Sequence, residues 1–188
     1  MRPNLNICHF IFDAINHKLY FETRNKKDET FGPKNIEKLF NNILNNNMLF
    51  QEYGQVDVTL VPKSNVVDNL LDNPIIKKLE IRITPPNPDD LADAEREVME
   101  RLNKLNAKTE EINYTAANEN GLSIDDNTKM IARIASTNGI VSIRAINKEG
   151  QLTRDSTRDY PCMEFFDADP ELGIETILKN FLQKRRAQ

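Results

Sequence analysis

The sequence predicts an α+β fold in which mainly antiparallel sheet carries helices on one face. Runs of alternating apolar and polar residues, typical of half-buried strands, are interspersed with apolar stripes at helical spacing. The predicted order of elements, ββαβαβαβαβββα, departs from the strict alternation of a doubly wound sheet, and several neighbouring strands form hairpins. We expect a single domain over residues 1–188, with a seam near 73–77 between an N-terminal and a C-terminal part.

The first half of the chain is predicted to contain a hairpin, a helix, a strand and a short helix. Aromatic and β-branched residues indicate the hairpin strands. The longer helix follows Gly32-Pro33 and has apolar residues at i, i+3, i+4, i+7 and i+8, while Ser64 or Asn65 caps the short one. The expected ranges are 7–23 for the hairpin, 36–44 for the helix, 56–60 for the strand and 65–71 for the short helix.

The second half begins with a strand, Lys78 to Thr84, that alternates with period 2, so one face of its sheet must meet water. Strands on both sides of a helix at 88–106 predict a ferredoxin-like βαβ element. Asn138-Gly139 is expected to end a helix in the left-handed conformation. The other predicted elements are a strand at 112–116, a helix from 123 or 125 to 137, a hairpin at 140–157, a buried strand at 162–166 and a helix at 170–186.

Charge and cysteine content restrict the partners and the cellular compartment that the chain can have. The 188 residues include 25 Lys and Arg and 29 Asp and Glu, for a net charge of −4, so any contact with nucleic acid must be local. Cys8 and Cys162 lie in apolar runs, which favours a reducing compartment. No apolar stretch approaches the ~18 residues of a membrane span, and no leader pattern opens the chain. We expect a cytoplasmic protein without membrane contact.

Sequence motifs for catalysis are absent. The six glycines form no phosphate-binding loop, and neither G-x-S-x-G nor C-x-x-C occurs. His9 and His17 are the only histidines. Cys8 and Asp13 cannot converge with them as ligands, because adjacent side chains of one strand point to opposite faces. We therefore expect packed or hydrogen-bonded histidines, no catalytic residue and no cofactor.

Acidic residues at the start of the helix at 88–106 allow two interpretations. Asp89, Asp90 and Asp93 would suit Mg²⁺ in a nuclease-like site, because this cation prefers carboxylate oxygens. Acids in a first helical turn also stabilise the positive end of the helix dipole without any metal. Asp125-Asp126 repeats the pattern at another helix start. The recurrence favours the second interpretation, and the metal site is kept as the alternative.

Basic residues gather around the hairpin at 140–157. Arg144, Lys148, Arg154 and Arg158, with Tyr160 nearby, form a candidate nucleic-acid contact, since arginine and lysine bind phosphate. The competing interpretation is a solvated edge hairpin whose charges oppose aggregation, because acidic residues are interspersed. Both interpretations place this segment at the surface.

Five stretches of the chain carry a resemblance, namely Cys8–Phe12, His17–Glu22, Lys78–Asp90, Asn106-Ala107 and Asn138–Gly150. In these stretches the chain resembles an uncharacterised prokaryotic domain-of-unknown-function family associated with phage defence. The strand-helix-strand segment and the polar hairpin are also similar, more faintly, to part of the Rex-type phage-exclusion sensor proteins, which are dimeric and contact DNA. The resemblance implies a phage-defence setting and provides no catalytic residue.

The expected function is that of a non-catalytic binding or sensor protein in antiphage defence. Its expected partners are a second copy of itself or a defence-system protein, with nucleic acid as a further partner. The absence of active-site motifs and the charged hairpin support this hypothesis. The alternative, from another class, is a metal-dependent nuclease-like enzyme that uses the acidic residues near 89–93.

Overall fold

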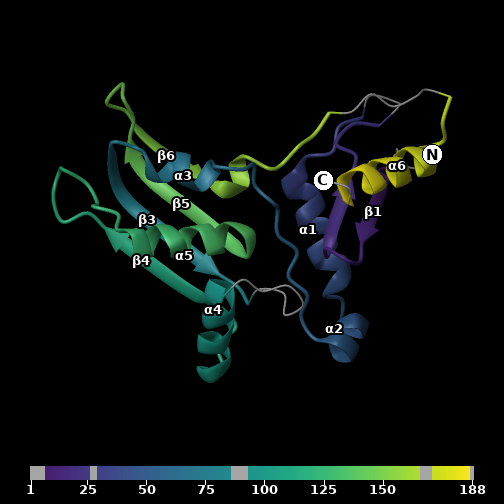
Figure 1. The fold of residues 1–188 in the computed structure, drawn as a ribbon, viewed down its shortest axis with the longest axis horizontal. Helices are drawn as coiled ribbons and strands as arrows, with labels where there is room; N and C mark the ends of the chain where they lie inside the picture. The colour runs from purple at the N-terminus through teal and green to yellow at the C-terminus, as the bar shows by residue number, and fades with distance from the viewer. Residues whose placement is uncertain (1–6, 26–28, 86–92, 166–170, 187–188) are drawn as a thin grey trace. The chain divides into compact units, whose positions relative to one another are not determined.

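The computed structural model describes residues 7–25, 29–85, 93–165 and 171–186. The chain divides into two compact units (Figure 1). Unit 1 comprises Met1–Val56 and Glu164–Gln188, and unit 2 comprises Asp57–Met163. Each unit combines an antiparallel sheet with helices, which confirms the predicted α+β class. The predicted seam at 73–77 falls inside unit 2, and the single domain over 1–188 stays a prediction.

Unit 2 is built on a four-stranded sheet with the order β4-β3-β5-β6, in which every neighbouring pair is antiparallel. Three helices, α3, α4 and α5, pack on one face, as predicted (Figure 1). The strands are β3 (Ile75–Ile83), β4 (Glu110–Thr115), β5 (Gly139–Ile146) and β6 (Leu152–Ser156). The helices are α3 (Val66–Leu71), α4 (Asp93–Lys104) and α5 (Asp126–Thr137).

The core of unit 2 lies between this sheet and its helices. Alternate residues of β3 and β5 are fully buried there, because side chains of a strand point alternately to opposite faces. They meet the apolar stripes of the three helices. The fully buried strand residues are Leu79, Ile81, Ile83, Val141, Ile143 and Ala145. The intervening residues of β3 and β5 therefore point to the opposite face of the sheet, which we call the outer face.

The segment around α4 is a strand-helix-strand unit, but it differs from the predicted ferredoxin-like element. In that element the two strands run parallel, with another strand between them. Here β3 and β4 are direct antiparallel neighbours, with Ile81 opposite Ile112. The connection through α4 reverses the chain onto the adjacent edge.

The start of α5 has a predicted capping residue, but the end of the helix differs from the prediction. Asp125 caps the start of this helix, and its side chain accepts a hydrogen bond of 2.7 Å from the Thr128 N–H. At the other end, Asn138 has φ −124°, so no left-handed cap forms. Gly139 instead begins β5, where a Cβ atom would overlap the carbonyl oxygen of Arg82. Close contact between strands, rather than backbone conformation, therefore requires this glycine.

Unit 1 contains the predicted N-terminal hairpin, made of β1 (Phe10–Asp13) and β2 (Lys18–Phe21). Two ring pairs with edge-to-face geometry join it to helices, Phe10 to Phe40 at 5.0 Å and Tyr20 to Phe181 at 5.2 Å between centroids. The helices of this unit are α1 (Pro33–Leu44), α2 (Asn47–Tyr53) and α6 (Ile174–Arg186). α2 was not predicted, and it buries none of its residues.

A buried carboxylate fixes the end of α6 against the hairpin. Asp13 is 1% exposed and accepts a 2.5 Å hydrogen bond from Arg186 and a 2.8 Å bond from the Asn16 amide. The bond from Arg186, followed by that from Asn16, holds the pKa of Asp13 well below its usual range. The carboxylate is therefore the charged partner on which the last turn of α6 depends.

Two predicted strands are absent, and both predictions were wrong. Residues 56–60 alternate in polarity but form no strand, and the Asn45 side chain bonds both the N–H and the C=O of Val56 in place of a partner strand. Residues 162–165 are exposed and not in a strand, and position 166 lies outside the described residues. Next to these two segments, an isolated bridge joins Pro62 and Pro161, where the Cys162 N–H donates to the Val61 carbonyl at 2.7 Å. An apolar pattern does not form a strand without a partner.

Gly139→Ala should destabilise unit 2 by about 1–3 kcal/mol, because the added methyl group forces β3 and β5 apart. Chemical denaturation measures this loss. Gly173→Ala is the control, since a Cβ there meets no described atom within 4 Å, and its effect should stay within about 0.5 kcal/mol. Equal stabilities for the two variants would contradict the close strand approach.

Asp13→Asn should lower the unfolding temperature at neutral pH, because the neutral amide cannot replace the charged partner of Arg186. The folded-state pKa of Asp13 is depressed, so its contribution is present above its unfolded pKa of about 3.9 and is lost as pH falls toward the folded value. The difference between wild type and variant should therefore shrink in acid. Asp72→Asn, at an exposed position, is the control. A difference that does not change with pH would refute the charged pair.

Candidate functional site

Three cations lie side by side on the outer face of unit 2, the sheet face opposite α3, α4 and α5. In the strand register, Lys78 of β3 is opposite Arg144 of β5, and Arg144 is opposite Arg154 of β6. We call these three residues the basic row. Neighbouring strands lie about 4.8 Å apart, so the row extends roughly 10 Å across three strands.

The basic row is electrostatically unfavourable within the protein itself. Like charges directly opposite each other destabilise a sheet, on the scale of about 0.2–1 kcal/mol that a cross-strand pair carries. Arg144 and Arg154 are exposed, and neither makes an ion pair or side-chain hydrogen bond with a described residue. Every other arginine in the described ranges has an interaction partner. These two guanidinium groups are therefore available to an external anion.

One carboxylate lies beside the basic row. Glu80 accepts a 2.6 Å hydrogen bond from the ammonium group of Lys78, two residues away on the same strand face. That bond lowers the pKa of Glu80, burial opposes the shift, and the charges of Lys78, Arg154 and Arg144 add to it. The surrounding field is thus positive enough to stabilise a negative charge at this place.

The rest of the outer face is mostly polar. Glu80 is opposite Ser142 in the register, Ser142 is opposite Ser156, and the two serine hydroxyls lie 3.0 Å apart. Arg82 pairs with Glu111 of β4 at 3.9 Å. The apolar residues of this face are aliphatic, namely Ile75, Ile140, Ile146 and Leu152. On the described strands the face therefore offers charge and hydrogen bonds but no aromatic stacking platform.

The structure brings together two of the four predicted basic residues. Arg144 and Arg154 form a register pair, whereas Lys148 lies in the exposed turn between their strands. Arg158 lies beyond β6 in the short helix η1 (Thr157–Asp159) and is half-buried. Lys78 was missed as a site residue, because only the pairing of β3 with β5, distant in sequence, brings it to the row.

The acidic alternative gains no support from the described residues. Asp93 is almost fully exposed on α4 and makes an ion pair of 3.4 Å with Arg96. Asp89 and Asp90 lie outside the described residues. The described part of the chain holds no group of three or more His, Cys, Asp or Glu side chains placed to bind a metal. The metal site stays a prediction.

His9 and Cys8 are held by local structure in unit 1. His9 Nδ1 lies 2.6 Å from a carboxylate oxygen of Glu22, which also accepts the His9 backbone N–H at 3.0 Å. The Cys8 thiol donates to the Glu22 carbonyl at 3.4 Å. Burial, followed by the charge of Glu22, raises the pKa of Cys8, so its thiol is less readily ionised than a free one. Local hydrogen bonds of the hairpin segment therefore hold both side chains.

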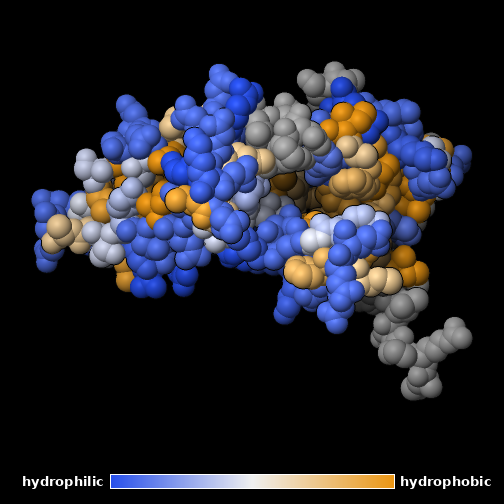
Figure 2. Space-filling model, turned by 90° about the horizontal axis from the view of Figure 1, so that it is seen from below, coloured by the Kyte–Doolittle hydropathy of each residue, from blue (hydrophilic) through white to orange (hydrophobic). Residues whose placement is uncertain are grey.

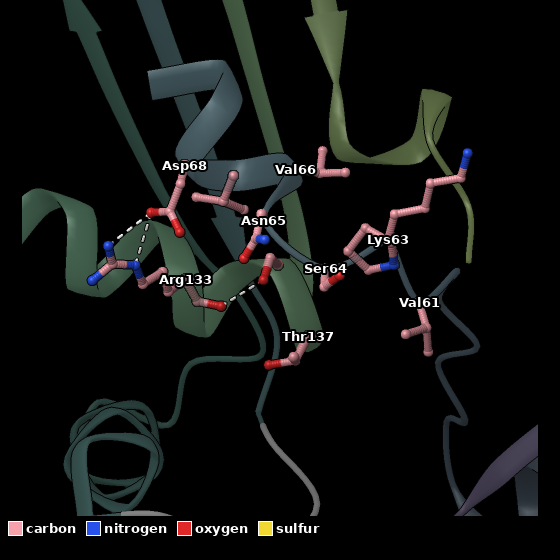
Figure 3. Close-up of a pocket in the computed structure, with 11 residues that line it drawn as sticks. Val61, Lys63, Ser64, Asn65, Val66, Asp68, Arg133 and Thr137 are labelled. Carbon is pink, nitrogen blue, oxygen red and sulfur yellow. Dashed lines mark hydrogen bonds and ion pairs between the residues drawn. The ribbon is translucent and has the colours of Figure 1, made fainter. Parts of the chain in front are cut away.

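A small cavity of about 160 Å³ lies between the segment before α3 and the last turn of α5 (Figure 3). Its charged side chains bind each other, with one Asp68 oxygen accepting from Arg133 Nε at 3.0 Å and from Nη2 at 2.7 Å. Lys63 points away from this pair. The Thr137 hydroxyl donates to a carbonyl of its own helix. The cavity therefore offers few groups to a ligand, and the basic row is the stronger candidate site.

No helix among the described residues is both long enough and apolar enough to cross a membrane. Neither the curated proteins nor the solved structures contain a match to the chain. One family model does match, over residues 1–183, which is nearly the whole chain. The chain belongs to the family described as Domain of unknown function (DUF4747).

Proposed function

We propose that the chain is a non-catalytic nucleic-acid-binding protein that contacts phosphates through the basic row. The observation that carries this proposal is the pair Arg144 and Arg154, directly opposed across two strands and without described ion-pair partners. Guanidinium groups bind phosphate oxygens through two parallel hydrogen bonds, which a flexible ammonium group does less specifically. The geometry of the pair thus suits a chain of phosphates.

An anionic ligand also resolves the electrostatic conflict within the row. Three adjacent cations repel one another, and a phosphate placed among them converts that repulsion into attraction. Lys78 contributes less, because its ammonium group already binds Glu80. The local cation excess contrasts with the net charge of −4 for the chain. The proposal therefore assigns the attraction to nucleic acid to this local excess of cations.

The proposal includes self-association, for which exposed apolar residues of unit 1 are the support. Figure 2 shows apolar residues at the surface of this unit, and patches of this kind often mark contacts between proteins. Large side chains about half exposed or more include Phe10, Phe12, Leu39, Ile43, Met48 and Phe50. The mass in sedimentation equilibrium is the test, where a dimer or larger assembly is expected and a strict monomer contradicts it.

Replacing Arg144 and Arg154 together with glutamine should weaken binding to single-stranded DNA and lower its dependence on salt. Each lost phosphate contact reduces the slope of log K against log salt by about 0.7, so the double variant should lose about 1.4. Fluorescence anisotropy at several salt concentrations measures both quantities. Arg96→Gln, which removes an exposed arginine from α4, is the matched control and should bind as wild type does.

The proposal fails if the unchanged protein shows no salt-dependent binding to nucleic acid. It also fails if the double variant and Arg96→Gln weaken binding equally, because the basic row would then have no special role. Circular dichroism of the variants separates lost binding from lost folding.

The proposed setting is antiphage defence, supported by the resemblance of the sequence stretches described above. If nucleic-acid contact serves defence, phages should form fewer plaques on cells that express the unchanged chain than on cells that express the double variant of Arg144 and Arg154. Plaque counts on a panel of phages provide the measurement. Equal plaque counts with the two chains would contradict a role of Arg144 and Arg154 in defence.

A further inference from the structure

We propose that Glu80 selects among bases, so that the preferred ligand is single-stranded nucleic acid whose bases carry exocyclic amino groups. This inference rests on the proposed function and adds a readout of the base to the phosphate contacts of the basic row. Cytosine, adenine and guanine have such amino groups, and uracil and thymine do not.

The position of Glu80 is the first part of the argument. Its side chain is 31% exposed on the outer face, beside Lys78 on the same strand. Arg144 lies diagonally across on β5 and Arg154 beyond it on β6, and the charges of all three cations act on Glu80. A carboxylate among phosphate-binding cations repels phosphate and weakens such a site. Beyond its bond to Lys78, its place beside the basic row is explained if it contacts a part of the ligand that donates hydrogen bonds.

The second part is the bonding capacity left on this carboxylate. Lys78 donates to Oε1, and no described residue donates to Oε2. An ionised carboxylate only accepts hydrogen bonds, and two oxygens accept about four. Glu80 can therefore keep its bond to Lys78 and accept an amino group from a base at the same time.

The third part is the spacing on the sheet. Glu80 and Ser142 lie one pleat repeat, about 7 Å, along the strands from Lys78 and Arg144. That separation is on the scale of a single nucleotide, with phosphate at one end and the base edge at the other. Ser142 and Ser156 place hydroxyl groups in the same register position as Glu80, where they add donors and acceptors.

The chemistry then distinguishes the bases. A cytosine N4 amino group donates to a carboxylate, and glutamate is a recognised acceptor for it. Thymine presents a carbonyl oxygen at the equivalent place, which a carboxylate repels. In a duplex one hydrogen of this amino group is paired and the other faces the major groove, which admits a helix or a two-stranded ribbon. A four-stranded sheet is too broad for that groove, so readout on its open face requires unpaired bases.

The test compares oligodeoxycytidylate and oligothymidylate of equal length at neutral pH by fluorescence anisotropy. Wild type should bind the cytosine strand at least about fivefold more tightly. Glu80→Gln should remove most of this preference, because the amide NH2 group can donate a hydrogen bond to the thymine carbonyl oxygen, which the carboxylate repels. It should bind both strands at least as tightly as wild type binds thymine, since a negative charge is lost.

Glu111→Gln is the matched control, because it removes a carboxylate from the same face at the pair with Arg82. It should strengthen binding to both strands similarly and keep the preference for cytosine. Equal binding of the two strands by wild type, with weaker binding of both after loss of Arg144 and Arg154, would overturn the role of Glu80 and leave the proposed function standing. Absence of salt-dependent binding to either strand would overturn both.

Discussion

The antiparallel pairing of β3 with β5 is the constraint on which the organisation of unit 2 depends. Both strands bury alternate residues against α3, α4 and α5, so their register is fixed by the core: a slip of one residue would expose Leu79 and Val141. The same register decides which polar side chains meet on the other face. Burial on one side thus determines the chemistry of the other.

This coupling explains why the basic row can persist despite its own repulsion. The core on the inner side supplies the free energy that holds Lys78, Arg144 and Arg154 in adjacent positions. Loss of an interstrand contact on the inner side, such as the close approach at Gly139, would therefore disturb the row as well. A rigid sheet keeps the cations in place before any ligand arrives, which lowers the entropic cost of binding.

Local patterns predicted most elements of the fold and two of the three residues of the basic row. Alternation over Lys78 to Thr84 identified β3, although the bulge between Ile76 and Lys78, which extends the strand back to Ile75, has no clear sequence signal. The residues at 56–60 show the opposite case, because their alternation is genuine but Asn45 takes the backbone bonds of Val56. Pairing between distant segments decides both outcomes, and a single sequence does not encode it locally.

The site illustrates the same physical limit. Arg144 and Arg154 lie close in sequence across a hairpin, so their proximity could be predicted. Lys78 and Glu80 are more than 60 residues away from them, and the composition of their strand shows only that one face is polar. Their membership of the site follows from the β3–β5 register alone.

An NMR titration of the isotope-labelled chain with oligodeoxycytidylate tests most directly whether the outer face binds nucleic acid. Chemical shifts should change for Lys78, Glu80, Ser142, Arg144 and Arg154, with little change in α3, α4 and α5. Changes confined to those helices or to unit 1, or no changes at all, would contradict the account.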